Sequence, residues 1–383
     1  MKNLKLFLAT AVLSTCAIAA NELPLRTDLN EKVLMIPVDK TFYGGDISLE
    51  TTLFKPDGDG PFPLVIINDG KSLGNPSFQD RSRYSLMATE FLKRGYAVAL
   101  PMQRGFSKSG GSNFYLEGCN SPYGAALKQA ADVRTVIAHF AKTPEIDTKK
   151  VIVAGQSFGG LGTMALASDA PDGVKLLLNF AGGLKYEGCQ WESTLKYTFE
   201  KLGENAKTPS LWFYGENDSF FPPELSKQLY SNFNKTNASA EMISFGKFRG
   251  DAHGMFGTRE GFDSIWWPVV EKKLISLNMP TAIIHPQYDS NNKTESTGYA
   301  QIDQLEKLPE FTRPKCKEKY ASFIKETAGQ RVFAIAENGG CGFSWGEDDK
   351  ENQFMAMNYC ERVSKGTPCQ LYLVDDKVVW PNS

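Results

Sequence analysis

Short apolar runs alternate with longer segments of helical periodicity from residue 32 to residue 278, and this alternation constrains the fold more than any other feature. Central runs such as 64–67 and 176–178 are apolar throughout, which is typical of strands covered by helices on both faces. The helical segments at 82–93, 125–142 and 225–234 are long enough for the crossovers that parallel strands require. We predict an α/β domain with a mostly parallel sheet and an antiparallel edge, with strands at 33–37, 49–54, 64–68, 97–101, 151–154, 176–180, 210–214 and 241–245.

The predicted strand at 151–154 runs into Gly155-Gln156-Ser157-Phe158-Gly159, and a helical segment follows. A strand, the pattern G-x-S-x-G and a helix in succession form a nucleophile elbow, a tight turn that holds a serine hydroxyl at the carboxyl end of a sheet. Glycines are needed there because neighbouring side chains would collide. The bare pattern also occurs by chance, so its context makes Ser157 the candidate nucleophile.

A serine hydroxyl is a weak nucleophile and needs a histidine base. In folds built around a nucleophile elbow, the histidine follows the acidic residue in the chain. The sequence contains three histidines. His253 follows the last predicted strand on a loop next to a glycine, where the fold places its base. His139 falls inside a predicted helix and His285 lies beyond the last strand, so we expect packing or surface roles for both. We predict His253 as the base, with a structural role as the alternative.

The acid that orients the histidine should follow a strand at the same sheet edge. Asp218 comes directly after the predicted strand at 210–214 and is the favoured candidate. Glu216 in the same turn and Asp251 near His253 are its rivals. An aspartate after a strand can also serve only as a turn former or a helix cap.

Several stretches carry a resemblance to a known family, and they lie at 63–70, 95–105 with 109–111, 155–160, 209–218 and 253–254. Between residues 30 and 277 the chain resembles the dienelactone hydrolase-like branch of the α/β hydrolases, in an exported, disulfide-containing form. The resemblance implies the α/β-hydrolase fold, with a mostly parallel eight-stranded sheet flanked by helices, and a triad of Ser157, Asp218 and His253. Dienelactone hydrolases proper use a cysteine nucleophile, so their lactone substrate is not carried over.

Acyl transfer also requires two donors aimed at the oxyanion. The backbone N–H of Phe158, directly after the nucleophile, is expected to be one of them. The second should come from the loop after the third strand, where many relatives carry His-Gly and this chain has Asp69-Gly70. Gly70 permits a close approach, and the Lys71 N–H is the predicted donor. An ordinary turn at the end of the strand is the alternative.

Apolar side chains near these motifs are candidates for an acyl or aryl pocket. The segment between the strands at 176–180 and 210–214 is too short for a large lid, so we predict an open site. Simple core packing is the alternative for each pocket candidate. The candidates are Phe106, Tyr115, Trp191, Phe220, Phe221 and Met255.

The N-terminus has the layout of a secretory signal peptide, with Lys2 and Lys5, an apolar run at 6–18 and small residues at 17–20. This predicts a secreted or periplasmic protein. A lipoprotein acylated at Cys16 is the alternative, because 13–16 looks similar to a lipobox.

Six of the seven cysteines lie beyond this segment. Six allow 15 pairings, and their separation favours one bridge between Cys119 and Cys189 and two local bridges among Cys316, Cys341, Cys360 and Cys369.

The character of the chain changes after residue 280, where 286–308 is polar and lacks apolar periodicity. We predict a signal peptide at 1–20, a catalytic domain at 21–279, a linker at 280–312 and a small accessory domain at 313–383. The accessory domain is expected to be α+β, with helices at 315–327 and 348–363, strands at 331–336 and 370–374, and disulfides. It resembles small cysteine-containing modules of exported bacterial proteins.

The formal net charge of −2 offers no attraction for nucleic acid, and no run after the signal segment is long and apolar enough to span a membrane. Neither a metal nor a cofactor is expected. The leading hypothesis is hydrolysis of a carboxylic ester, in a small-molecule or peptide-like substrate, through an acyl-enzyme. Peptidase, amidase or acyltransferase action on the same residues is the first alternative, and a non-catalytic binding protein that works through its tail is the second.

Overall fold

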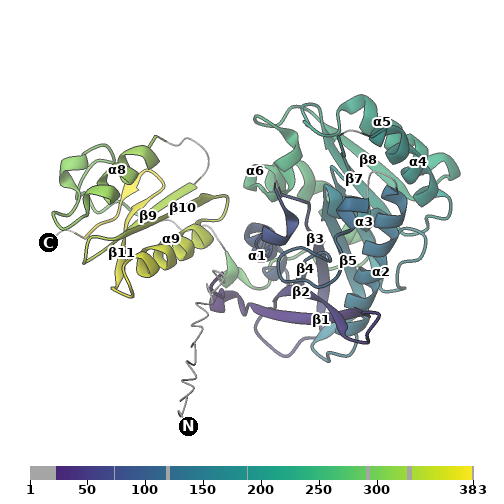
Figure 1. Ribbon diagram of the computed structural model, residues 1–383, viewed down its shortest axis with the longest axis horizontal. Coiled ribbons are helices and arrows are strands. Elements are labelled where there is room, and N and C mark those ends of the chain that lie inside the picture. Colours follow the sequence, from purple (N-terminus) through teal and green to yellow (C-terminus); the bar gives the residue numbers. More distant parts are fainter. Residues whose placement is uncertain are drawn as a thin grey trace, which may run out of the picture.

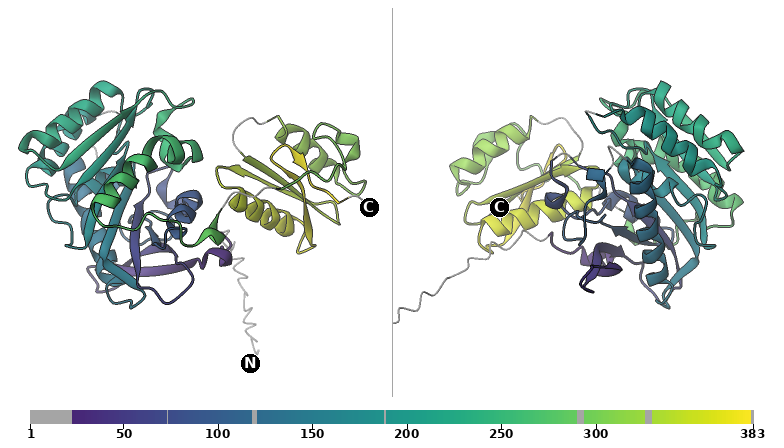
Figure 2. Two further views of the ribbon diagram at one scale, coloured as in Figure 1. Left: turned by 180° about the vertical axis from the view of Figure 1, so that it is seen from behind. Right: turned by 45° about the vertical axis from the view of Figure 1, so that its right-hand side comes forward.

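The computed structural model describes residues 23–72, 74–117, 121–187, 189–289, 294–325 and 330–381. The described residues form an eight-stranded sheet and a four-stranded sheet, each with its own helices (Figure 1). The two units lie side by side, and the view from behind shows the same arrangement (Figure 2). The predicted signal peptide, Cys16 and Cys119 lie outside the described residues.

The larger sheet confirms the predicted α/β architecture. Its order is β1-β2-β4-β3-β5-β6-β7-β8, in which β1, β2 and β4 pair antiparallel and all other neighbours pair parallel. The predicted antiparallel edge is therefore confirmed as well. The strands are β1 (Lys32–Lys40), β2 (Asp46–Phe54), β3 (Phe62–Asn68), β4 (Ala97–Pro101), β5 (Ile146–Gln156), β6 (Val174–Phe180), β7 (Ser210–Gly215) and β8 (Ala240–Phe245).

Helices cover both faces of this sheet, which explains the uninterrupted apolar runs. In β3, Leu64 and Ile66 belong to the core under α2 to α5, whereas Val65 and Ile67 belong to the core under α1 and α7. Successive residues of one strand thus enter two different cores. The helices are α1 (Ser85–Leu92), α2 (Pro122–Phe140), α3 (Phe158–Met164), α4 (Trp191–Gly203), α5 (Pro223–Phe233), α6 (Arg259–Gly261) and α7 (Trp267–Ser276).

The smaller, C-terminal unit is an antiparallel sheet of order β10-β9-β11-β12, with α8 and α9 on its opposite faces (Figure 1). Sequence reasoning anticipated β9, β11 and the two helices but missed β10 and β12. The elements are α8 (Pro314–Phe323), β9 (Gln330–Ala336), β10 (Cys341–Gly346), α9 (Asp349–Val363), β11 (Cys369–Val374) and β12 (Lys377–Val378).

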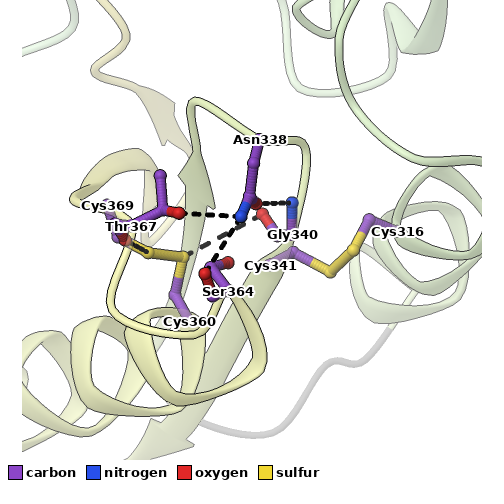
Figure 3. Close-up of a disulfide and its surroundings, with 8 residues drawn as sticks. All are labelled: Cys316, Asn338, Gly340, Cys341, Cys360, Ser364, Thr367 and Cys369. Atoms are coloured by element: carbon purple, nitrogen blue, oxygen red, sulfur yellow. Dashed lines mark hydrogen bonds between the residues drawn. A yellow bond between two sulfur atoms is a disulfide. The ribbon is translucent and has the colours of Figure 1, made fainter.

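Two local disulfides hold this unit together, as predicted, and the structure decides their pairing. Cys316 of α8 is bonded to Cys341 of β10, and Cys360 of α9 is bonded to Cys369 of β11 (Figure 3). Cys189, which we expected to pair with Cys119, lies just before α4; its expected partner is outside the described residues. The side chain of Asn338 adds hydrogen bonds next to the second disulfide.

The segment predicted as a linker contacts both units. The backbone N–H groups of Ile284 and His285 donate to the Lys93 carbonyl at 2.9 Å each, and the Tyr288 side chain is buried against the larger unit. Ala300 and Leu308, further along, belong to the core of the smaller unit.

Ion pairs connect the two units. Glu351, in the first turn of α9, lies 2.7 Å from a guanidinium nitrogen of Arg26 and 2.7 Å from one of Arg83. Glu347 lies 2.5 Å from a guanidinium nitrogen of Arg249. Within the described part of the chain, no helix has the length and apolar character to cross a bilayer.

Candidate active site

The predicted nucleophile lies in a sharp turn between β5 and α3. Ser157 is the single residue between these elements and has φ 55° and ψ −121°, a backbone conformation that side-chain-bearing residues adopt rarely and mostly at functional sites. A Cβ on Gly155 would lie 2.3 Å from the Gly159 carbonyl oxygen, and a Cβ on Gly159 would lie 2.2 Å from a carbonyl oxygen of β3. The turn therefore requires glycine at both positions, as the motif predicts.

Asp218 and His253 are brought together by the loops after β7 and β8. The Nδ1 atom of His253 lies 3.2 Å from Asp218 Oδ1 and 3.1 Å from Oδ2. The Asp218 side chain is 0 % exposed, and its Oδ1 accepts the backbone N–H groups of Phe220 at 2.8 Å and Phe221 at 2.9 Å. These two bonds fix the carboxylate so that it faces the imidazole.

The rival acids occupy other positions. Glu216 is exposed in the turn after β7. Asp251 accepts hydrogen bonds from the Ser219 hydroxyl at 2.6 Å, the Ser219 N–H at 3.1 Å and the His253 N–H at 2.9 Å. Burial alone would raise the pKa of Asp251, but these hydrogen bonds outweigh it and lower the pKa. Asp251 thus ties the acid loop to the backbone of the histidine loop.

Further contacts place the histidine loop beside the elbow. The side-chain amide of Gln156, next to the predicted nucleophile, donates to the His253 carbonyl at 2.9 Å. The Gly183 N–H donates to the Ser157 carbonyl at 3.0 Å, and the Phe221 ring lies against both Gly183 and the His253 ring. Ser157, Asp218 and His253 therefore share one sheet edge, as the chain order predicts. Sequence reasoning missed the loop-joining role of Gln156.

The other two histidines lie elsewhere. His139 is in α2, where its ring contacts Phe140. His285 lies beyond α7, next to Tyr288. Both positions agree with the packing and surface roles expected for these residues.

The loop after β3 lies directly against the nucleophile. A Cβ on Gly70 would be 3.0 Å from the Ser157 Cβ. The Gly70 N–H is already donated to Asp69 Oδ1 at 2.7 Å. By contrast, the backbone N–H of Lys71 has no acceptor among the described residues. Phe158 is the first residue of α3, and an N–H in that position has no acceptor within its own helix.

A cavity of about 570 Å³ opens next to these residues. Of the predicted pocket residues, Tyr115 and Phe220 line it, and the Phe220 ring centroid is 4.4 Å from that of His253. Sequence reasoning missed the polar lining, which includes Lys185 and Glu187. The Lys185 ammonium nitrogen lies 5.6 Å from the Phe220 ring centroid, and that of Lys71 lies 4.8 Å from the Tyr115 ring centroid. Two cations thus flank an aromatic pocket.

Four other pocket candidates do not line this cavity. Phe106 and Met255 are 1 % and 2 % exposed and pack in the two cores, so the core-packing alternative holds for them. Phe221 is likewise 1 % exposed, beneath His253 and 6.4 Å from the Trp191 ring. No group of three or more His, Cys, Asp or Glu within the described ranges is arranged to hold a metal ion.

Comparisons with known proteins bear on this arrangement. Residues 44–195, which include the elbow, match the family model described as X-Pro dipeptidyl-peptidase (S15 family). Together with the strand order and the turn between β5 and α3, this match decides the superfamily. The chain belongs to the α/β-hydrolase superfamily.

This α/β hydrolase is similar to the quorum-quenching protein AidA of Acinetobacter baumannii, with 28% identity over 133 residues. Those residues are 35% of this chain and 40% of that protein, so the chain spans about two fifths of the length of this curated relative.

Similar solved structures include esterases. A proposed dienelactone hydrolase from Klebsiella pneumoniae has 17% identity and a TM-score of 0.45, over 63% of this chain and 98% of that one. The esterase Pf2001 from Pyrococcus furiosus has 15% identity and a TM-score of 0.47, over 66% and 96%. Esterase 2 from Thermogutta terrifontis, phosphorylated by paraoxon, has 17% identity and a TM-score of 0.46, over 66% and 96%.

Proposed function

We propose that this α/β hydrolase is a serine esterase, with Ser157 as nucleophile, His253 as general base and Asp218 as the residue that orients the base. The contact of both Asp218 oxygens with His253 Nδ1, beside a serine held at φ 55°, carries the proposal. A carboxylate on Nδ1 fixes the imidazole tautomer so that Nε2 can accept a proton.

The proposed reaction uses these three roles. His253 Nε2 takes the Ser157 hydroxyl proton while Oγ attacks the ester carbonyl, and the tetrahedral oxyanion forms. The imidazolium gives its proton to the leaving alcohol, and the acyl group stays on Ser157. Water, activated by His253, releases the acid and restores the free serine.

We propose the N–H groups of Phe158 and Lys71 as the oxyanion donors. Gly70 touches the nucleophile but has its N–H engaged by Asp69, whereas the Lys71 N–H has no acceptor in the described part of the chain. The role of Gly70 is accordingly steric, because any larger residue would collide with Ser157.

The pocket supports an acyl or aryl group with an anionic substituent. Tyr115 and Phe220 supply apolar surface, and Lys185 and Glu187 are the charged residues of the lining. Lys71, whose ammonium group lies against the Tyr115 ring, adds a further positive charge beside the cavity. Peptidase action is the second candidate, favoured by the match of residues 44–195 to the X-Pro dipeptidyl-peptidase model. Glu187 would then face the amino group of the peptide.

Labelling with a fluorophosphonate probe tests the nucleophile. We expect stoichiometric labelling of the wild type, none for Ser157→Ala, and loss for His253→Ala. His139→Ala is the matched control and should label normally, because His139 is in α2 outside the site. A folded wild type that does not label would contradict the proposal. Hydrolysis of p-nitrophenyl esters, compared with that of an X-Pro p-nitroanilide, then separates esterase from peptidase.

We also propose that the protein is exported. Disulfides such as Cys316–Cys341 persist in oxidising compartments, which is consistent with the predicted signal peptide. N-terminal sequencing of the mature protein should begin at Ala20 or Asn21. A lipid-modified Cys16 at the mature N-terminus would favour the lipoprotein alternative instead.

A further inference from the structure

Asp69, at the carboxyl end of β3, is the centre of a hydrogen-bond network behind the site. Its Oδ1 accepts the Gly70 N–H at 2.7 Å and the Tyr84 hydroxyl at 2.9 Å. Its Oδ2 accepts the Gln79 amide at 3.0 Å and the Ser82 hydroxyl. Among the described residues, no lysine, arginine or histidine pairs with this carboxylate, so hydrogen bonds alone hold it.

The same network holds the backbone of the oxyanion loop, which we define as residues 69–72. The Gln79 amide nitrogen also donates to the Gly70 carbonyl at 3.1 Å, and its oxygen accepts the Ser72 N–H at 2.9 Å. From the other side, the Gln103 amide donates to the Asp69 carbonyl at 2.9 Å. Because the Gly70 N–H is turned toward Asp69, the Lys71 N–H is the next donor left for substrate.

The network also reaches the other two catalytic loops. The Tyr84 hydroxyl is 3.3 Å from Gln156 Oε1, and the Gln156 amide nitrogen donates to the His253 carbonyl at 2.9 Å. The Tyr84 ring lies 5.2 Å from the Phe256 ring, in the histidine loop. Tyr84 has φ 42°, a left-handed backbone conformation that is unusual for a bulky residue and strains the chain. Such strain persists where the surroundings over-determine a conformation, often at functional sites.

We propose that Asp69 is a positioning residue of this enzyme, which sets the orientation of the oxyanion loop and couples it through Tyr84 and Gln156 to the histidine loop. The inference rests on the proposed function, because it assigns a role in stabilising the oxyanion. Asp69 touches neither the nucleophile nor the imidazole, so its effect passes through the groups it holds. Oxyanion donors act mainly in the transition state, and a displaced donor lowers kcat more than it changes KM.

Asp69→Asn is the central variant, because it keeps the shape of the side chain but turns one acceptor into a donor. The new NH₂ group faces the Gly70 N–H if it replaces Oδ1, or the Gln79 amide N–H if it replaces Oδ2, and a donor opposite a donor displaces the loop. Removal of a whole oxyanion donor costs about 100- to 1,000-fold in kcat. A displaced donor should therefore cost about 10- to 100-fold, with KM within about threefold of the wild type.

Asp132→Asn is the matched control. Asp132 is 4 % exposed in α2 and pairs with Arg104, so its replacement also perturbs a buried carboxylate. It should lower the thermal midpoint without lowering kcat. Tyr84→Phe removes one donor to Asp69 and should lower kcat by a smaller factor, and the double variant with Asp69→Asn should lose less than the product of the two single factors.

Two readouts separate positioning from a merely structural role. The affinity for a trifluoromethyl ketone, which forms an oxyanion adduct with serine, should fall in parallel with kcat/KM, while the affinity for the carboxylic acid product stays unchanged. Full fluorophosphonate labelling of Asp69→Asn at long times should show that fold and nucleophile remain. A Ser157→Ala variant that retains activity would refute the esterase proposal itself. An active wild type with unchanged kcat in Asp69→Asn, or an equal loss in Asp132→Asn, would overturn only the inference about Asp69.

Discussion

The two disulfides of the C-terminal unit should contribute unequally to its stability. The Cys316–Cys341 bond joins residues 25 apart, and the Cys360–Cys369 bond joins residues 9 apart. Loop-closure entropy in the unfolded chain then gives about 3.5 kcal/mol for the first and about 2.6 kcal/mol for the second at 25 °C. All four cysteines are buried, so replacement in pairs by alanine avoids a buried polar group.

Hydrogen bonds near the second disulfide should make the difference between the two disulfides' contributions to stability larger. The nine-residue loop is also held by the Asn338 amide, which donates to the Ser364 carbonyl at 2.9 Å and to the Thr367 hydroxyl at 2.8 Å (Figure 3). These bonds do not involve the Cys360–Cys369 disulfide, so we expect them to remain in its absence. The Cys316–Cys341 disulfide, by contrast, anchors α8 to the edge strand β10 across the core.

Hydrogen exchange of the full chain, read in peptides from β9 and α9, measures this stability directly. The free energy of opening should fall by about 3.5 kcal/mol for the pair Cys316→Ala and Cys341→Ala, and by about 2.6 kcal/mol or less for the pair Cys360→Ala and Cys369→Ala. Peptides from β5 and β6 serve as the control and should be unaffected. The reverse order, or losses below about 1 kcal/mol in both, would refute the loop-closure reasoning.

Three further outcomes are expected. Burial raises the pKa of the Asp348 carboxyl group to about 6. The native state therefore binds a proton at this carboxyl group more tightly than the unfolded state does, and the free energy of unfolding falls as pH rises from about 4 to about 6. Asp348→Asn keeps the N-cap of α9 and should raise the melting temperature at pH 8 but not at pH 4, as thermal unfolding at both pH values will reveal. Gly159→Ala places a Cβ 2.2 Å from a β3 carbonyl oxygen and should abolish both soluble yield and fluorophosphonate labelling. Glu351→Gln removes a charged acceptor from the buried guanidinium groups of Arg26 and Arg83, which should cost about 2 kcal/mol in urea unfolding and lower exchange protection in α9.

The fold of the larger unit was predictable because the amino-acid composition of each strand indicates whether one or both of its faces are buried. A strand whose successive residues enter two cores must be apolar throughout, as residues 64–67 are. Parallel strands also place their carboxyl ends at one sheet edge. Ser157, Asp218 and His253 could therefore be selected from the elbow motif, their order in the chain and their positions after strands, and their catalytic roles stay predictions.

Contacts that depend on side-chain geometry could not be predicted. Gln156 and Asp251 join loops that are far apart in the sequence, and neither has a sequence pattern of its own. For Asp69 one signal existed, since it stands where many relatives carry histidine. The sequence could mark that difference but could not say which donors surround the carboxylate.

Short or glycine-rich strands were missed for a different reason. In β10, Phe343 and Trp345 alternate with Gly342 and Ser344, and glycine weakens a strand pattern. The pocket residues were also hard to predict, because the side chains of Phe106 and Met255, which pack in the cores, are as apolar as those that line a pocket. Composition alone does not separate the two environments.

The donors around Asp69 favour positioning over proton transfer. Burial, together with the neighbouring Asp69 carboxylate, raises the pKa of Tyr84 well above its ordinary value, so its hydroxyl stays protonated and remains a donor at working pH. The side-chain amides of Gln79 and Gln156 do not titrate in this range either. Burial raises the pKa of Asp69, and the hydrogen bonds that it accepts oppose this shift. The donors around Asp69 stay fixed, so they can hold backbone N–H groups in one orientation before substrate arrives. Preorganised dipoles of this kind are what oxyanion stabilisation requires, since they need no reorganisation during the reaction.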